Sequence, residues 1–144
     1  MQMEVVRFAD APGYTVANHD EVSVRRLQGG EASSAAFVLV GHTIFPAGAV
    51  IPMEAGPTGK IYVVVEGSLS VEQADGVRHT LSRMDSIFVP AGEARAVVND
   101  SGAPAAIVVV TPRRRLERRD RDVGLVTLLE YDTATRPPPQ ACPP

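Results

Sequence analysis

The feature that most constrains the fold of this chain is residues 45–67, which read FPAGAVIPMEAGPTGKIYVVVEG. Two runs rich in Val and Ile flank a loop of Gly and Pro residues, and the second run ends at Glu66-Gly67. Val, Ile and Tyr are enriched in strands, whereas Gly and Pro favour turns. The stretch therefore predicts a strand, a tight loop, and a second strand that ends in a glycine turn.

Similar short runs recur along the chain and are separated by turn residues. We expect strands at residues 4–8, 21–27, 36–45, 50–53, 60–66, 68–73, 77–81, 86–89, 95–99 and 105–111. The links contain hairpin signals such as Asp75-Gly76 and residues 99–102, NDSG. Because no long helical pattern separates these runs, they predict an antiparallel sandwich, barrel or jelly roll.

Composition limits the class of protein and its partners. A chain of 144 residues with 44% hydrophobic residues can bury the core of one domain. The net charge of −3 gives no global field that would attract nucleic acid or a membrane. The N-terminus lacks the pattern of a secretory signal, and the single cysteine, Cys142, cannot form an internal disulfide. We therefore expect a cytoplasmic protein with neither nucleic-acid nor membrane partners.

The character of the sequence changes after Pro112, so residues 1–112 are expected to form a barrel and residues 113–144 a C-terminal extension. Residues 113–121 are rich in Arg with interspersed acids, which indicates a solvated helix or loop more than an anion-binding or nucleic-acid-binding patch. Residues 122–131 are apolar enough for a last strand or a short helix, and the spacing of their apolar residues does not distinguish the two. The remainder is a Pro-rich tail.

A second stretch, residues 84–99, reads MDSIFVPAGEARAVVN, and together the two stretches resemble the paired motifs of the cupin family. The shared frame consists of Gly48, Gly67, Asp85, Pro90, Gly92 and Asn99. The intervening hairpin, residues 68–81, also matches in place and length. The resemblance covers about residues 21–112. It implies an all-β, antiparallel double-stranded β-helix, that is, a jelly-roll barrel.

The chain departs from the family at the positions that usually bind a metal. Counted from Gly67, the two motif histidines fall on Glu54 and Gly56, the motif glutamate on Lys60, and the second-motif histidine on Arg95. Lys and Arg cannot ligate a divalent cation and would repel one. We therefore expect no metal and no other cofactor, which argues against a metal-dependent dioxygenase. The alternative is a displaced metal site that uses His19, His42 or His79.

The resemblance implies that the motif side chains at these positions point into the barrel lumen. Strand alternation then places Lys60 and Tyr62 on one face, with Arg95 on the facing strand and Glu54 at the mouth. Buried charges are costly, so such a cluster either forms an internal salt bridge that fills the lumen or serves as an anion pocket. In the second case Lys60 and Arg95 bind a carboxylate or enolate, and Glu54 transfers a proton.

Three further side chains are weaker candidates. His42, on the strand before the first motif, is a possible catalytic acid or base alongside Glu54, Lys60 and Arg95. His19, in an N-terminal loop, and Tyr62 are candidates for substrate binding, together with Lys60 and Arg95. The alternatives are a surface histidine and a core tyrosine whose hydroxyl is satisfied by the protein.

These observations predict a metal-independent enzyme that acts on a small anionic organic acid by proton transfer next to a carbonyl. The reaction would be that of an isomerase, lyase or decarboxylase. The alternative is a non-catalytic cupin that binds a small molecule as a sensor or carrier. The resemblance also implies a homodimer in which residues 4–8 pair as an edge strand with a second subunit.

Overall fold

The computed structural model describes residues 2–113 of the chain, which form two β-sheets. A short 3-10 helix, η1 (Phe8–Asp10), precedes the strands. The strands are β1 (Ser23–Gln28), β2 (Val38–Phe45), β3 (Val50–Glu54), β4 (Lys60–Glu66), β5 (Ser68–Gln73), β6 (Arg78–Ser82), β7 (Ser86–Val89), β8 (Arg95–Val98) and β9 (Ala105–Pro112). Within residues 2–113 no helix has the length and apolar character needed to cross a membrane.

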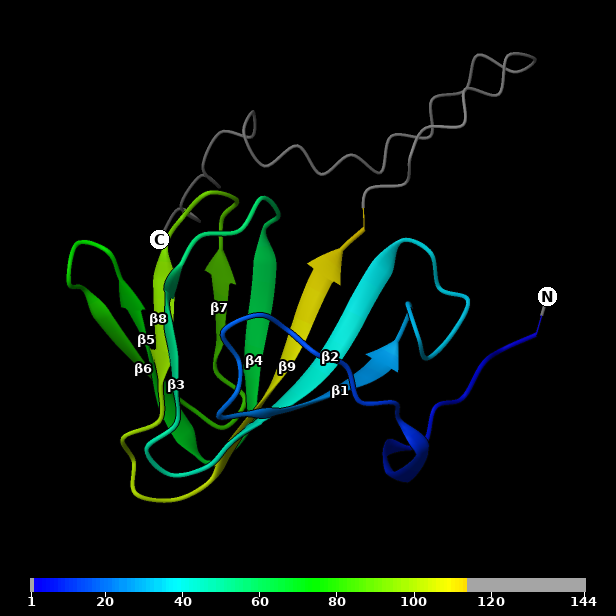
Figure 1. The fold of residues 1–144 in the computed structure, drawn as a ribbon, viewed down its shortest axis with the longest axis horizontal. Helices are drawn as coiled ribbons and strands as arrows, with labels where there is room; N and C mark the ends of the chain where they lie inside the picture. Colours follow the sequence, from blue (N-terminus) through cyan, green and yellow to red (C-terminus); the bar gives the residue numbers. More distant parts are fainter. Residues whose placement is uncertain (1, 114–144) are drawn as a thin grey trace, which may run out of the picture.

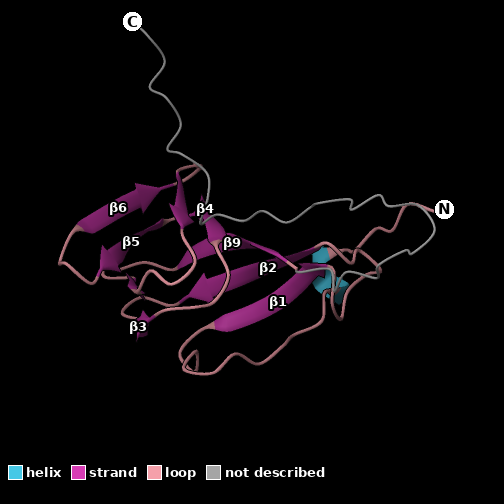
Figure 2. Cartoon of the chain, turned by 90° about the horizontal axis from the view of Figure 1, so that it is seen from above, coloured by secondary structure: helices cyan, strands magenta, loops and turns pink. Residues whose placement is uncertain are grey.

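The strands pair only in antiparallel fashion. One sheet has the order β1-β2-β9-β4-β7, and the other has the order β3-β8-β5-β6. Figure 1 shows the first sheet spread across the molecule with the second beside it, and Figure 2 shows the same strands from above. Neighbours far apart in sequence, such as β2 and β9, lie side by side, as in a jelly roll. The prediction of an all-β, antiparallel jelly-roll barrel is confirmed.

A core of interdigitated apolar side chains closes one end of the space between the sheets. The fully buried members include Phe45, Val64, Leu69, Val71 and Ile107, each at most 2% exposed. In β4 the buried residues alternate with more exposed ones, as the pleat requires. This packing leaves the other end of the barrel free for a cavity.

The buried Asn99 holds the turn between β8 and β9. Its side chain is completely buried, and Nδ2 donates hydrogen bonds to the main-chain oxygens of Phe45 (2.9 Å) and Ala103 (2.8 Å). Its Oδ1 accepts one from the hydroxyl of Ser101 at 2.7 Å. This residue of the family frame is therefore structural, because it supplies polar partners to a buried turn.

Gly67 links the two sheets at the end of β4. Its φ angle is +68°, and a Cβ at this position would lie 2.5 Å from the main-chain oxygen of Pro104. Both the backbone conformation and the close approach exclude a larger residue. The glycine turn predicted at this point is present for that reason.

The expected strand at residues 4–8 is wrong. These residues run without strand pairing into η1, and Glu4 is held by side-chain contacts instead. Its carboxylate accepts a hydrogen bond from the main-chain N–H of Ser34 at 3.1 Å, and its carbonyl accepts one from Gln28 at 3.5 Å. The homodimer remains a prediction, but the edge strand from which it was inferred does not form.

The remaining strand predictions agree with the structure to within about two residues, and residues 60–66, 68–73 and 86–89 agree at both ends. The last strand ends at Pro112, where the barrel was expected to end. The predicted C-terminal helix or strand and the Pro-rich tail lie outside the described residues, as does the Arg-rich run beyond Arg113.

Candidate functional site

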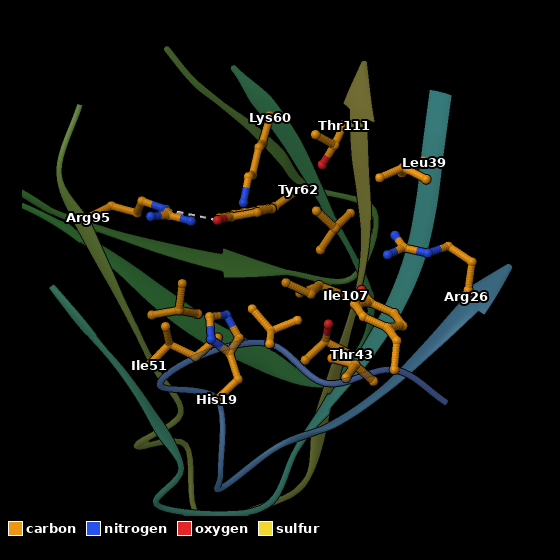
Figure 3. Close-up of a pocket in the computed structure, with 15 residues that line it drawn as sticks. His19, Arg26, Leu39, Thr43, Ile51, Lys60, Tyr62, Arg95, Ile107 and Thr111 are labelled. Atoms are coloured by element: carbon orange, nitrogen blue, oxygen red, sulfur yellow. Dashed lines mark hydrogen bonds between the residues drawn. The ribbon is translucent and has the colours of Figure 1, made fainter. Parts of the chain in front are cut away.

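A cavity of about 190 Å³ lies between the two sheets, at the end of the barrel that the core leaves free (Figure 3). One wall comes from β1, β2, β4 and β9, and the opposite wall comes from β3 and β8. The loop that precedes β1 covers one side and contributes Tyr14, Val16 and His19. The polar residues that line the cavity are Tyr14, His19, Arg26, Thr43, Lys60, Tyr62, Arg95 and Thr111.

The register of the five-stranded sheet places two of these residues on one row. Arg26 pairs with Gly41, Gly41 pairs with Val109, and Val109 pairs with Tyr62. Residues that are paired across a sheet point to the same face. Arg26 and Tyr62 therefore face the cavity from two ends of one row, with β2 and β9 between them.

Arg95 is fixed in position by neutral and acidic partners. Its side chain is only 6% exposed, and Nε donates a hydrogen bond to the Tyr62 hydroxyl at 2.9 Å. Its Nη1 donates to the main-chain oxygen of Glu54 at 2.8 Å and lies 3.9 Å from the Glu54 carboxylate. Burial raises the pKa of Tyr62 while the Arg95 charge opposes that shift, so the hydroxyl is neutral at physiological pH.

Lys60 has no such partners. Among residues 2–113 its ammonium group makes neither an ion pair nor a hydrogen bond, and Figure 3 shows it extending toward Tyr62 and Arg95. Burial lowers the pKa of Lys60, and the Arg95 charge lowers it further, while Glu54 acts in the opposite direction. An ammonium that lacks a counterion and faces a cavity is a site for an anion.

His19 lies at this cavity, where the sequence predicted it. Its Nδ1 is 2.6 Å from the main-chain oxygen of Ala17, and because a carbonyl only accepts, Nδ1 carries the proton. That leaves Nε2 on the side of Glu54, with 3.9 Å between Nε2 and the carboxylate oxygen. His19, Glu54 and Arg95 thus form a row in which Nε2 can accept or return a proton.

The structure does not bring His42 to this cluster. Its neighbours Gly41 and Thr43 are buried and face inward, so strand alternation turns His42 to the outer face of the sheet. There its ring packs edge-on against Phe8, with 4.8 Å between the ring centres. Burial lowers its pKa. The prediction that His42 acts as a catalytic acid or base beside Glu54 is therefore wrong, because the side chain lies outside the cavity.

Sequence reasoning missed Arg26, which lies at the side of the cavity away from Arg95, and Tyr14, whose ring stacks against the Arg26 guanidinium. A signal for Arg26 existed in the alternation of Val22, Val24 and Arg26, which puts all three on one face of the strand. Nothing local marked Tyr14, because its position depends on how the N-terminal loop folds back over β1 and β2.

An internal salt bridge, the alternative to an anion pocket, does not fill the lumen. Arg95 and Glu54 do approach each other, but the cavity persists beside them and Lys60 has no carboxylate partner within residues 2–113. The arrangement is that of a pocket with cationic walls.

A divalent metal, which this fold often holds, does not suit these residues. The positions expected for ligands carry Glu54, Gly56, Lys60 and Arg95, and within residues 2–113 no three His, Cys, Asp or Glu side chains gather as a metal site would require. The alternative, a displaced metal site that uses histidines, does not agree with their positions. His42 is on the outer face of the sheet, and His79 is hydrogen-bonded to Gln73 at 2.6 Å.

The fold is a jelly-roll barrel with a cavity between its two sheets. The family model for the cupin domain matches residues 41–111. The β-D-galactosidase Rv1717 of Mycobacterium tuberculosis is 35% identical over 109 residues, which cover 74% of this chain and 91% of that protein. The chain belongs to the cupin family.

Solved structures agree on the fold. The polyketide cyclase RemF from Streptomyces resistomycificus matches with a TM-score of 0.70 and 22% identity, over 81% of this chain and 83% of that one. A sugar phosphate isomerase of the cupin superfamily from Silicibacter pomeroyi matches with a TM-score of 0.64 and 24% identity, over 75% and 74% of the two chains. At these identities the likeness concerns the fold alone.

Proposed function

We propose that this protein is a metal-independent enzyme that binds a small anionic organic acid in the cavity and moves a proton next to its carbonyl group. The observation that carries the proposal is the Lys60 ammonium, which faces the cavity without a counterion among residues 2–113. Beside it, Arg95 is held by Tyr62 and by the main chain of Glu54. A substrate carboxylate would supply the missing negative charge.

The side chains suit the individual steps of proton transfer. Nε2 of His19, aided by the adjacent Glu54, takes a proton from the carbon next to the substrate carbonyl. The electron pair of that C–H bond forms a C=C bond while the π pair of the C=O bond moves to the oxygen. Lys60 and the neutral Tyr62 hydroxyl stabilise the resulting enolate. Return of the proton to another carbon completes an isomerisation, and loss of a leaving group from the neighbouring carbon completes an elimination.

The comparisons support the coarser part of this proposal. The cyclase and the isomerase named above have small molecules as substrates on the same fold. The fold by itself does not select a reaction. The choice of proton transfer rests on the residues of this cavity.

Solvent exchange tests the proposal directly. The protein is incubated in deuterium oxide with a panel of short 2-oxo and hydroxy acids, and incorporation of deuterium next to the carbonyl is followed by NMR. We expect incorporation for the acids that bind, with a loss of about 100-fold in rate for His19→Gln. Binding of the same acids without any exchange would support the sensor or carrier alternative.

Hydrolysis of a β-D-galactoside is a second candidate, favoured by the 35% identity to a β-D-galactosidase. Glycoside hydrolases commonly use two carboxylates that flank the scissile bond. Within residues 2–113, the Glu54 carboxylate lies 3.9 Å from the cavity-lining Arg95, but Glu31 is paired with Arg26, so the usual pair is incomplete. Turnover of a nitrophenyl β-D-galactoside that is abolished in Glu54→Gln would establish this activity in place of proton transfer.

A further inference from the structure

Arg26 is a second guanidinium at the cavity, opposite Arg95, and it has no role in the proposed reaction. Its side chain is 12% exposed, Nε donates to the Glu31 carboxylate at 2.9 Å, and its guanidinium carbon lies 3.8 Å from the centre of the Tyr14 ring. Neither Nη atom has a hydrogen-bond partner among residues 2–113. Figure 3 shows the Nη atoms directed into the cavity.

The sequence is adapted to hold Arg26 in this position. A Cβ on Gly41 would lie 2.5 Å from the Tyr14 hydroxyl, so the glycine makes room for the ring on which the guanidinium stacks. Stacking and the Glu31 contact together leave the guanidinium little freedom. Two N–H groups are thereby fixed at one side of the cavity before any ligand binds.

The two sides of the cavity differ in charge. Arg26 is paired with Glu31 at hydrogen-bonding distance, so that side presents N–H donors from a neutral pair. Lys60 has no carboxylate partner within residues 2–113, and Arg95 is 3.9 Å from its nearest carboxylate. Three side-chain cations at the cavity thus face the two carboxylates of Glu31 and Glu54, which leaves one positive charge for the ligand to balance.

We propose that Arg26 and Tyr14 form a specificity subsite for an uncharged oxygen, a hydroxyl or a carbonyl, at the far end of a short monocarboxylate. The carboxylate of that ligand binds Lys60 and Arg95, so the inference rests on the proposed anion site. A dicarboxylate of equal length is selected against, because its second charge would face the Arg26–Glu31 pair. The cavity volume of about 190 Å³ restricts the ligand to a short molecule.

Calorimetric titration with three five-carbon acids tests this subsite. The probes are pentanoate, 5-hydroxypentanoate and glutarate, which differ only at the end remote from the carboxylate. We expect the wild-type protein to bind 5-hydroxypentanoate about tenfold more tightly than pentanoate, and glutarate less tightly than 5-hydroxypentanoate. In Arg26→Met the advantage of 5-hydroxypentanoate over pentanoate disappears.

Glu31→Gln provides a second variant that reverses the preference. Glu31 is half exposed, so the substitution leaves the fold intact, but it frees the Arg26 charge. Glutarate should then bind about tenfold more tightly than it binds the wild-type protein. Lys60→Met weakens all three acids alike.

Two other results would contradict the proposal, the first at the Arg26 subsite and the second at the anion site as well. If the ratio between 5-hydroxypentanoate and pentanoate is the same in wild type, Arg26→Met and Glu31→Gln, the Arg26 subsite is wrong and the anion site stands. If none of the acids binds, or if Lys60→Met binds them as wild type does, the anion site and the subsite are both wrong.

Discussion

Nε of Arg95 donates a 2.9 Å hydrogen bond to the Tyr62 hydroxyl, and this bond joins the two sheets across the cavity. Tyr62 belongs to β4 of the five-stranded sheet, and Arg95 belongs to β8 of the four-stranded sheet. Because the hydroxyl oxygen accepts from Arg95, its own proton remains available to a ligand. The contact therefore positions a cation and leaves a neutral donor beside it.

We expect Tyr62→Phe to lower both stability and ligand affinity. The substitution leaves the buried Arg95 Nε without its acceptor, which costs about 1–3 kcal/mol in free energy of unfolding. Urea denaturation measures the effect. Tyr14→Phe is the matched control, since the Tyr14 hydroxyl makes no hydrogen bond within residues 2–113, and an equal loss in both variants would contradict the role of the Arg95 contact.

Lys60→Met should stabilise the protein while it removes anion binding. The ammonium is partly buried beside Arg95 and has no counterion among residues 2–113, so its replacement by a similar apolar chain relieves desolvation and repulsion. We expect a gain of about 1 kcal/mol and a higher melting temperature at neutral pH. Arg83→Met, at an exposed position, is the control and should change neither property. A clear destabilisation by Lys60→Met would argue that Lys60 has a structural role.

The pH dependence of stability provides an independent check on Lys60. Its pKa in the folded protein is lowered from the usual 10.5. Between the lowered value and 10.5 the unfolded chain holds a proton that the folded protein has released, so the contribution of Lys60 to stability increases with pH in that window. The advantage of Lys60→Met should shrink there, and the affinity of wild type for a carboxylate should fall. Denaturation of both proteins across alkaline pH measures the trend, which a constant difference would contradict.

Asn99→Asp should be strongly destabilising. The carboxylate cannot donate to the main-chain oxygens of Phe45 and Ala103, and the site is completely buried. We expect a loss of about 3 kcal/mol or more, measured by chemical denaturation. Asn18→Asp, at an exposed residue with a φ of +61°, should be nearly neutral. Similar losses in the two variants would show that Asn99 does not support the turn as described.

Gly41→Ala should alter ligand selection through Tyr14. The added methyl group would meet the Tyr14 hydroxyl at 2.5 Å, so the ring must shift and release the guanidinium of Arg26. We expect a loss of about 1–2 kcal/mol in stability and a reduced preference for 5-hydroxypentanoate over pentanoate. Gly56→Ala is the control, because no atom lies within 4 Å of the new methyl group. If Gly41→Ala keeps the preference for 5-hydroxypentanoate over pentanoate, Tyr14 does not contribute to the subsite.

The sequence allowed prediction of those features that depend on local chemistry. Gly67 marked a turn that only glycine can make, and the alternation of side chains along β4 placed Lys60 and Tyr62 on one face. Side-chain alternation also explains the error at His42, because both faces of β2 carry apolar residues and the inward face could not be recognised from hydrophobicity alone. The error lay in the choice of face, and the strand itself was predicted.

Features that depend on long-range contacts could not be predicted. The side chain of Glu4 bonds to Ser34, so residues 4–8 form no strand despite a suitable composition. The Arg26–Glu31 pair follows a register shift between Arg26 and Gln28 at an edge strand, and Tyr14 reaches it from a separate loop. No short pattern in the sequence indicates that these segments meet.

Tyr14, His19 and Arg26 all precede residues 41–111, the part of the chain that matches the family model. The part of the barrel that matches the family model thus supplies Lys60 and Arg95, the cationic wall. The N-terminal loop and the edge strand β1 supply the side chains that would determine selectivity between acids. Homologues could exchange one substrate for another by altering these N-terminal residues and leaving the barrel unchanged. In such a lineage, substrate preference would diverge faster than the fold, and the substrate of one member would be a poor guide to that of the next.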